Sequence, residues 1–262
     1  MSARHARSRS VMVVQGIALN TFREAVRDRI LYLLLVFALL LIAVSRSVSH
    51  LTVGSERKIV TDLGLSSISI FGILTAVFLG VSLVFKEIDK RTIFTLLANP
   101  VPRWQFVVGK YLGLMTVLTV NVALMSVVLA LILAGGPVSA LWPAVTLTLI
   151  ELALITAFAL LFSSFTNPIL AVVGTLAVYV TGHLTWSFEL LKSRVPSGFV
   201  TTLSDVLYWV LPNLSLLNVR AEVVHGRPVP PATVAWAALY GLAYAAVVLA
   251  GACVVFERRD FK

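Results

Sequence analysis

Charged residues are scarce in this chain: Asp, Glu, Lys and Arg make up 13% of its 262 residues, whereas 59% are hydrophobic. Soluble domains carry about 25% charged residues, so the composition predicts a membrane protein with the lipid bilayer as a partner. The formal net charge of +9 would suit nucleic acid. In a membrane protein, however, excess Lys and Arg records topology and attraction to anionic headgroups, and we expect no nucleic-acid partner.

Cysteine is almost absent, and so are the motifs of catalysis and of metal or nucleotide binding. The one cysteine, Cys253, excludes an internal disulfide and a cysteine-cluster metal site. The four histidines lack metal-ligand spacing, and no Gly-x-Ser-x-Gly motif occurs. Gly109-Lys110-Tyr111 lacks the upstream glycine of a phosphate-binding loop, and Tyr111 stands where such a loop has Ser or Thr. We therefore expect no enzymatic activity, no catalytic residue, no metal site and no cofactor in this chain.

Long apolar runs predict a single-domain, all-α polytopic membrane protein with six transmembrane helices. Glycine, proline and polar breakers separate the runs, as at 163–168, where SSFTNP follows the fourth. The six predicted spans are residues 30–45, 63–85, 107–134, 142–163, 168–187 and 233–256.

Two further segments flank these spans. Residues 10–29 carry apolar side chains at helical spacing opposite charged ones, which predicts an amphipathic helix lying in the membrane interface. Residues 188–232 form the one long loop, and Pro212 interrupts its apolar middle at 199–219. We expect short interfacial or re-entrant helices in this loop rather than a seventh span.

The distribution of positive charge predicts the orientation. Of the 21 Lys and Arg residues, fourteen lie in the amino-terminal tail, the 86–110 loop and the carboxy-terminal tail, and the other seven lie in the 45–62 and 187–232 loops. Cytoplasmic loops carry the excess of Lys and Arg, so both termini and the 86–110 loop are predicted to be cytoplasmic. The 188–232 loop is then extracytoplasmic.

The 86–110 loop holds a charged, amphipathic segment between two apolar runs. Its charged start leads into an apolar patch, and Pro100 and Pro102 then interrupt the helix and form a stiff hinge. A short helix at 87–99 with one apolar side and a charged first turn can dock on another protein. The residues expected at this contact are Glu87, Arg91, Ile93, Phe94, Leu97 and Arg103.

Three polar residues fall inside predicted spans: Asn121, Glu151 and His183. Glu151 lies roughly 14 Å into the fourth span at 1.5 Å per residue, where an ionisable group costs at least about 2.5 kcal/mol. It could line a translocation path or proton site, or it could make a helix–helix contact, for instance with Asn121. His183 is expected to pack near the outer end of the fifth span. Gly109 and Gly113 form a GxxxG pattern, which permits close approach of a neighbouring helix.

The motifs around the 86–110 loop resemble the signature of type-2 ABC transporter permeases. Their spread along the chain is similar to that in the permease of the nitrous-oxide-reductase maturation transporter. The chain departs from the signature at Pro102, where Ser is commoner, and at Arg91, where Gly is common. The matching segments are 87–92 (EIDKRT), 96–97 (LL), 99–103 (NPVPR) and 109–113 (GKYLG).

This resemblance implies a transmembrane permease subunit, working as an exporter in the cytoplasmic (inner) membrane of a prokaryote. Its partner would be the dimer of a separate cytoplasmic ABC ATPase, which binds ATP and Mg and holds residues 87–99 as a coupling helix. A second permease copy, identical or related, would complete the transport core. The first, second and fifth spans tend to face the pathway in such dimers. The polar candidates there are Ser66, Ser67, Ser69, Thr175, Thr181 and His183.

Two other functions compete with transport powered by an ATPase. A mechanotransmitting membrane subunit of an extracytoplasmic maturation complex would couple an outer partner protein to the ATPase without moving a conventional solute. A secondary transporter or channel should show inverted repeats or several intramembrane charges. The sequence has one such charge and no evident repeat, which makes this alternative the weakest.

Overall fold

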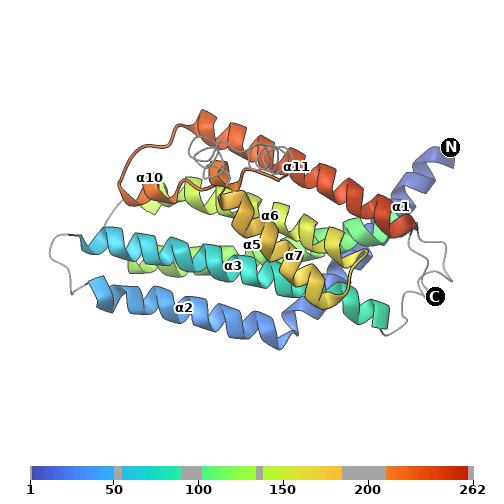
Figure 1. The fold of residues 1–262 in the computed structure, drawn as a ribbon, viewed down its shortest axis with the longest axis horizontal. Helices are drawn as coiled ribbons and strands as arrows, with labels where there is room; N and C mark the ends of the chain where they lie inside the picture. Colours follow the sequence, from blue (N-terminus) through green and yellow to red (C-terminus); the bar gives the residue numbers. More distant parts are fainter. Residues whose placement is uncertain (1, 50–54, 90–101, 134–137, 185–210, 259–262) are drawn as a thin grey trace, which may run out of the picture.

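The computed structural model describes residues 2–49, 55–89, 102–133, 138–184 and 211–258, and the regular secondary structure in these ranges is entirely helical. The long helices run side by side along the longest axis of the molecule (Figure 1). The elements are α1 (Ser2–Val26), α2 (Arg29–Ser49), α3 (Glu56–Asp89), α5 (Arg103–Ile132), η1 (Val138–Leu141), α6 (Trp142–Ser163), α7 (Pro168–His183), η2 (Leu214–Leu217), α10 (Arg220–Val224) and α11 (Pro231–Arg258).

Five helices in the described ranges are long and apolar enough to cross a membrane. They are α2, α3, α5, α6 and α11, and they overlap five of the predicted spans. The remaining predicted span, 168–187, coincides with α7, which has 16 residues. At 1.5 Å per residue α7 is about 24 Å long, less than the roughly 30 Å of a hydrocarbon core. The structure supports a multi-pass helical membrane protein, and the number of six spans stays a prediction.

Local sequence explains several helix ends. Pro102 precedes α5 with φ −58° and ψ 136°, an extended conformation that breaks the helix there. The Asn167 side chain caps α7 by accepting a hydrogen bond from the Leu170 N–H, and Pro168 occupies its first turn. α3 is longer than the predicted span at both ends and continues to Asp89. Its last residues therefore enter the range 87–99 predicted for the coupling helix, whereas residues 90–101 lie outside the described ranges.

α6 lies at the centre of the bundle and packs against α3, α5, α7 and α11. Its side chains at Leu152, Leu154 and Ile155 are fully buried, because helices surround it on all sides. α2 packs on α3 and leaves most of its apolar side chains exposed, as expected of a helix that faces lipid. α1 begins at Ser2, before the predicted start at residue 10, and packs along α5.

Different helix ends lie at the two ends of the bundle (Figure 1). We call "docking end", after the contact predicted for residues 87–99, the end formed by the last turns of α3, the first turns of α5 and the α1–α2 junction. The carboxy-terminal end of α11 lies there too. We call "distal end" the opposite end, formed by the start of α3, η1 and α10. This grouping agrees with the orientation predicted from charge, in which both termini and the 86–110 loop share one side.

Candidate functional site

Within the docking end, an ion pair ties the end of α3 to the α1–α2 junction. The Lys86 ammonium near the end of α3 donates to a carboxylate oxygen of Asp28 at 2.6 Å. Asp28 also accepts a hydrogen bond from the Ile30 N–H at 3.0 Å, and its side chain is 7% exposed. The two residues are 58 positions apart, so the sequence offered no signal that they pair. The consequence is that the end of α3 and the start of α2 are fastened together.

A second ion pair ties α1 to α5. Lys110 belongs to the family-like Gly-Lys motif, yet its side chain is only 1% exposed. Its ammonium lies 3.5 Å from a carboxylate oxygen of Glu24 and 5.8 Å from the centre of the Phe106 ring. A carboxylate and an aromatic face both stabilise a cation that has lost water. Lys110 therefore packs and pairs inside the docking end.

α11 is joined to the same end through Arg103. The guanidinium of Arg103, in the first turn of α5, donates to the backbone carbonyls of Phe256 at 3.4 Å and Glu257 at 3.0 Å. These carbonyls lie in the last turn of α11, where a helix lacks internal partners and its dipole favours a cation. Phe256 also stacks on Phe106 with ring centres 5.4 Å apart.

The glycines of the GxxxG pattern make room for α1. A methyl group built on Gly113 would lie 2.6 Å from the Ala18 carbonyl oxygen, and one on Gly109 would lie 2.7 Å from Ile17 side-chain atoms. Contacts this short leave no space for a β-carbon. The predicted close helix approach is therefore present, and its partner is α1.

The described ranges include only part of the predicted docking residues. Glu87 lies on α3, and Arg103 and Pro102 lie at the start of α5. The others lie outside the described residues; they are Arg91, Ile93, Phe94, Leu97 and Pro100.

A polar cluster forms inside the bundle around Glu151. This side chain is 3% exposed, and its Oε1 lies 3.3 Å from Nε2 of His183 on α7, a close contact that does not have the geometry of a hydrogen bond. The suggested contact between Glu151 and Asn121 is not formed: the side-chain oxygen and nitrogen of Asn121 have no hydrogen-bond partner among the described residues. The register of α6 against α7, which the sequence does not reveal, decides between the two partners.

A small cavity adjoins this cluster. The cavity is lined by Glu151, Ser69 and Arg220, among others. Its volume of about 20 Å³ suffices for one water molecule. Arg220 also forms an ion pair with Asp62 at 3.2 Å and donates to the Ser66 hydroxyl at 2.7 Å. Asp62 and Arg220 were missed in the sequence because they belong to segments far apart in the chain. Together these contacts hold the start of α10 against α3.

A comparison with known protein families matches nearly the whole chain. The profile of the family described as "ABC-2 family transporter protein" matches residues 15–261. The chain belongs to this ABC-2 family. A search of curated proteins found no match. The protein is thus a transmembrane ABC transporter permease, and an ATPase subunit and the membrane are its implied partners. The resemblance to the permease of the nitrous-oxide-reductase maturation transporter stays a prediction, and the family match assigns no role to single residues.

The pH dependence of the stability of this ABC-2 permease should show the contribution of the Asp28–Lys86 ion pair. Burial acts to raise the pKa of Asp28, but the hydrogen bonds from Lys86 and Ile30 and the Lys86 charge outweigh it and lower that pKa. A lowered folded pKa means that the stabilisation is present above the unfolded value of about 3.9 and is lost as the pH falls through the folded pKa. We expect Asp28→Asn to cost about 1 kcal/mol at neutral pH and to cost nothing once the wild-type carboxylate is protonated.

Thermal unfolding of the purified permease between neutral and strongly acidic pH measures this difference. Glu222→Gln, on the exposed surface of α10, is the matched control and should follow the wild type at every pH. An Asp28→Asn deficit that persists unchanged at the acid end would contradict the assignment.

A double-mutant cycle tests the Glu151–His183 contact. Glu151→Met and His183→Phe keep approximate size. The first leaves the partly exposed His183 ring, and the second the buried Glu151 carboxyl group, without its observed neighbour. We expect both single variants to be destabilised and the double variant to recover about 1 kcal/mol of coupling energy. The melting temperatures of the four proteins give the cycle. The same cycle between Glu151→Met and Asn121→Leu should be additive, because those side chains are not paired.

Proposed function

We propose that this permease is the transmembrane subunit of an ABC exporter and that a separate cytoplasmic ATPase drives it by docking on residues 87–99. The observation that carries the proposal is the fastening of the docking end. The α3 and α5 ends that flank residues 90–101 are each tied to other helices, through Lys86–Asp28, Lys110–Glu24 and Arg103. A force applied to the segment between them would therefore reach α1, α2 and α11 as well as α3 and α5.

The proposed mechanism is a shift between inward-open and outward-open states. ATP and Mg bind to the partner ATPase dimer, whose movement displaces the coupling helix. Because the chain has differential contacts with the ATPase in the two states, ATP binding biases their equilibrium. Pro100 and Pro102 would keep the connection to α5 stiff, so that displacement tilts α5 instead of bending the link. A second permease copy completes the transport core in this proposal.

The orientation proposed for the permease follows from its charge distribution. Both termini and the docking end face the cytoplasm of a prokaryote, and the distal end faces outward. A cysteine introduced at Lys58, at the distal end, should react with a membrane-impermeant maleimide in intact cells, and one at Arg258 should not. The opposite labelling pattern would reverse the assignment.

The test of the transport proposal is reconstitution with the ABC ATPase encoded by a neighbouring gene. The two proteins should co-purify, and ATP hydrolysis in vesicles should respond to a transported lipid, peptide or drug. If the ATPase does not bind the permease, the proposal fails.

A second candidate is transmission of force to a partner protein outside the membrane. It is favoured by the contacts of the segment 212–220 at the distal end. Arg220 is paired with Asp62 on α3. The Leu214 side chain and the Pro212 carbonyl pack against Gly182 of α7. Movement of α3 and α7 would thus displace this segment directly. ATP hydrolysis that responds to an extracytoplasmic protein, and to no small molecule, would select this candidate over export.

A further inference from the structure

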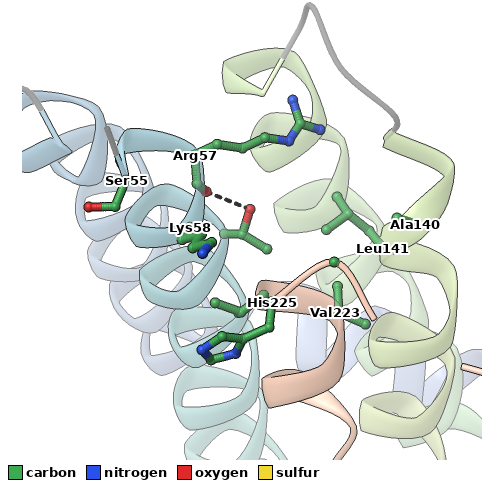
Figure 2. Close-up of a pocket in the computed structure, with 10 residues that line it drawn as sticks. Ser55, Arg57, Lys58, Ala140, Leu141, Val223 and His225 are labelled. Atoms are coloured by element: carbon green, nitrogen blue, oxygen red, sulfur yellow. Dashed lines mark hydrogen bonds between the residues drawn. The ribbon is translucent and has the colours of Figure 1, made fainter. Parts of the chain in front are cut away.

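A cleft at the distal end has the chemistry of a site for a phosphate group. It has a volume of about 280 Å³ and lies between the first turns of α3, η1 and the turn that follows α10. Figure 2 shows Arg57 and Lys58 on the α3 side and Leu141 and Val223 on the opposite side. The ring of His225 points back towards α3 (Figure 2).

The charge of the lining is one-sided. Arg57, Lys58 and His225 are basic, and none of the ten lining residues is acidic. Arg57 and Lys58 also stand in the first turn of α3, where free backbone N–H groups and the helix dipole add to the positive potential. Glu56 shares that turn but does not line the cleft. The combination favours an anion over a neutral or cationic ligand.

The three basic side chains are held in different ways. The Arg57 guanidinium donates to the Leu133 carbonyl at 3.4 Å, which holds it against the end of α5. His225 is held through Nδ1, which lies 2.8 Å from the Ala221 carbonyl oxygen. Because a carbonyl only accepts, Nδ1 carries the hydrogen. Lys58 is exposed and has the freedom to follow a ligand.

The level of the cleft indicates where the phosphate would come from. Two candidate membrane spans begin beside it, Glu56–Lys86 and Ser139–Ser163. Trp142, next to the lining residue Leu141, is 47% exposed, as expected of an indole at the headgroup level. Leu141 and Val223 are 7% and 8% exposed and form an apolar wall at that level. Inorganic phosphate has no apolar part to pack against this wall. A phospholipid carries acyl chains beside its phosphate group, and these can contact the wall.

We propose that this cleft binds the phosphate group of an anionic phospholipid, with Lys58 and His225 beside the phosphate and Leu141 and Val223 against the upper part of the acyl chains. Arg57 adds positive charge from its position against the end of α5 (Figure 2). A lipid bound there bridges α3, η1 and α10. It therefore holds α10 against α3 and η1, whether or not an ATPase is bound at the docking end.

Binding is measured on the purified, delipidated full chain by the rise in melting temperature with short-chain phosphatidylglycerol. Short-chain phosphatidylcholine and inorganic phosphate are the comparison ligands. We expect concentration-dependent protection by phosphatidylglycerol, little by phosphatidylcholine, and an affinity for phosphatidylglycerol that falls as salt rises. Equal protection by both lipids would overturn the proposal. Protection by inorganic phosphate equal to that by phosphatidylglycerol would also overturn the lipid assignment and leave a free-anion site.

Charge removal in the cleft should weaken this binding. Arg57→Gln with Lys58→Gln should raise the dissociation constant of phosphatidylglycerol at least about tenfold, a loss expected when charge-assisted hydrogen bonds to phosphate disappear. Arg227→Gln is the matched control, because Arg227 is exposed at the same end and does not line the cleft. Lys58→Gln alone provides the test if the double variant does not fold. Unchanged affinity in the folded cleft variants would refute the site.

Discussion

Leu97→Asp is expected to abolish co-purification of the permease with its ATPase. Leu97 is predicted to form the apolar side of the coupling helix with Ile93 and Phe94, and a buried Leu at a contact contributes about 1.5–3 kcal/mol. Aspartate loses this burial and also places an unpaired carboxylate in the apolar contact. The combined loss of about 3 kcal/mol or more corresponds to a factor of at least about 100 in affinity. Binding is measured by pull-down and by interferometry on the purified subunits.

The controls separate lost docking from lost folding. Leu97→Met keeps an apolar side chain of similar volume and should retain binding. Deletion of residues 93–98 should abolish binding as Leu97→Asp does. Leu97→Asp should leave the melting temperature of the isolated permease within about 2 °C of the wild type if the helix faces solvent before docking. Retained ATPase binding by both Leu97→Asp and the deletion would refute the docking role of residues 87–99.

Gly113→Ala is the second change with a large expected effect. The added methyl would sit 2.6 Å from the Ala18 carbonyl oxygen and 2.6 Å from the Thr21 β-carbon. A backbone oxygen cannot turn aside as a flexible side chain can, so α1 has to move away from α5. We expect a loss of about 2–3 kcal/mol in stability, in line with overpacking of a close contact. Chemical or thermal unfolding of the purified permease gives this value.

The matched control is Gly251→Ala on α11. A methyl there would meet no atom closer than 4.0 Å, so the change should be neutral or slightly stabilising because alanine favours a helix. Gly113→Ala should also weaken the stimulation of the ATPase by the permease more than its binding, since separating α1 from α5 breaks the fastening of the docking end. A Gly113→Ala protein as stable as Gly251→Ala would show that α1 does not pack on α5.

These two predictions test successive parts of one path. In the proposed mechanism, Leu97 receives the force from the ATPase, and the contact at Gly113 passes that force on to α1. Lys110 lies between them in the chain, and its pairing with Glu24 places charge on the same α1–α5 contact that the glycines bring close. A permease that binds its ATPase but does not stimulate it is therefore the expected state of variants along this contact.

The helical architecture could be predicted from the sequence because it depends on local properties. Apolar runs of span length, Pro102 before α5 and Asn167-Pro168 before α7 act within a few residues and specify where helices form and end. The distribution of Lys and Arg likewise gave a prediction of orientation without any contact being known. The signature around residues 87–113 indicated the family that the profile match then established.

Tertiary structure alone decided which residues meet. The sequence contained the GxxxG pattern at Gly109 and Gly113, but only packing identifies α1 as the helix that fills it. It contained Glu151 as an isolated charge, and only the register of α6 against α7 gives it His183 instead of Asn121. The physical reason is that such pairings span long separations in the chain, where each contact depends on the rotation and register of whole helices and not on the residues beside it.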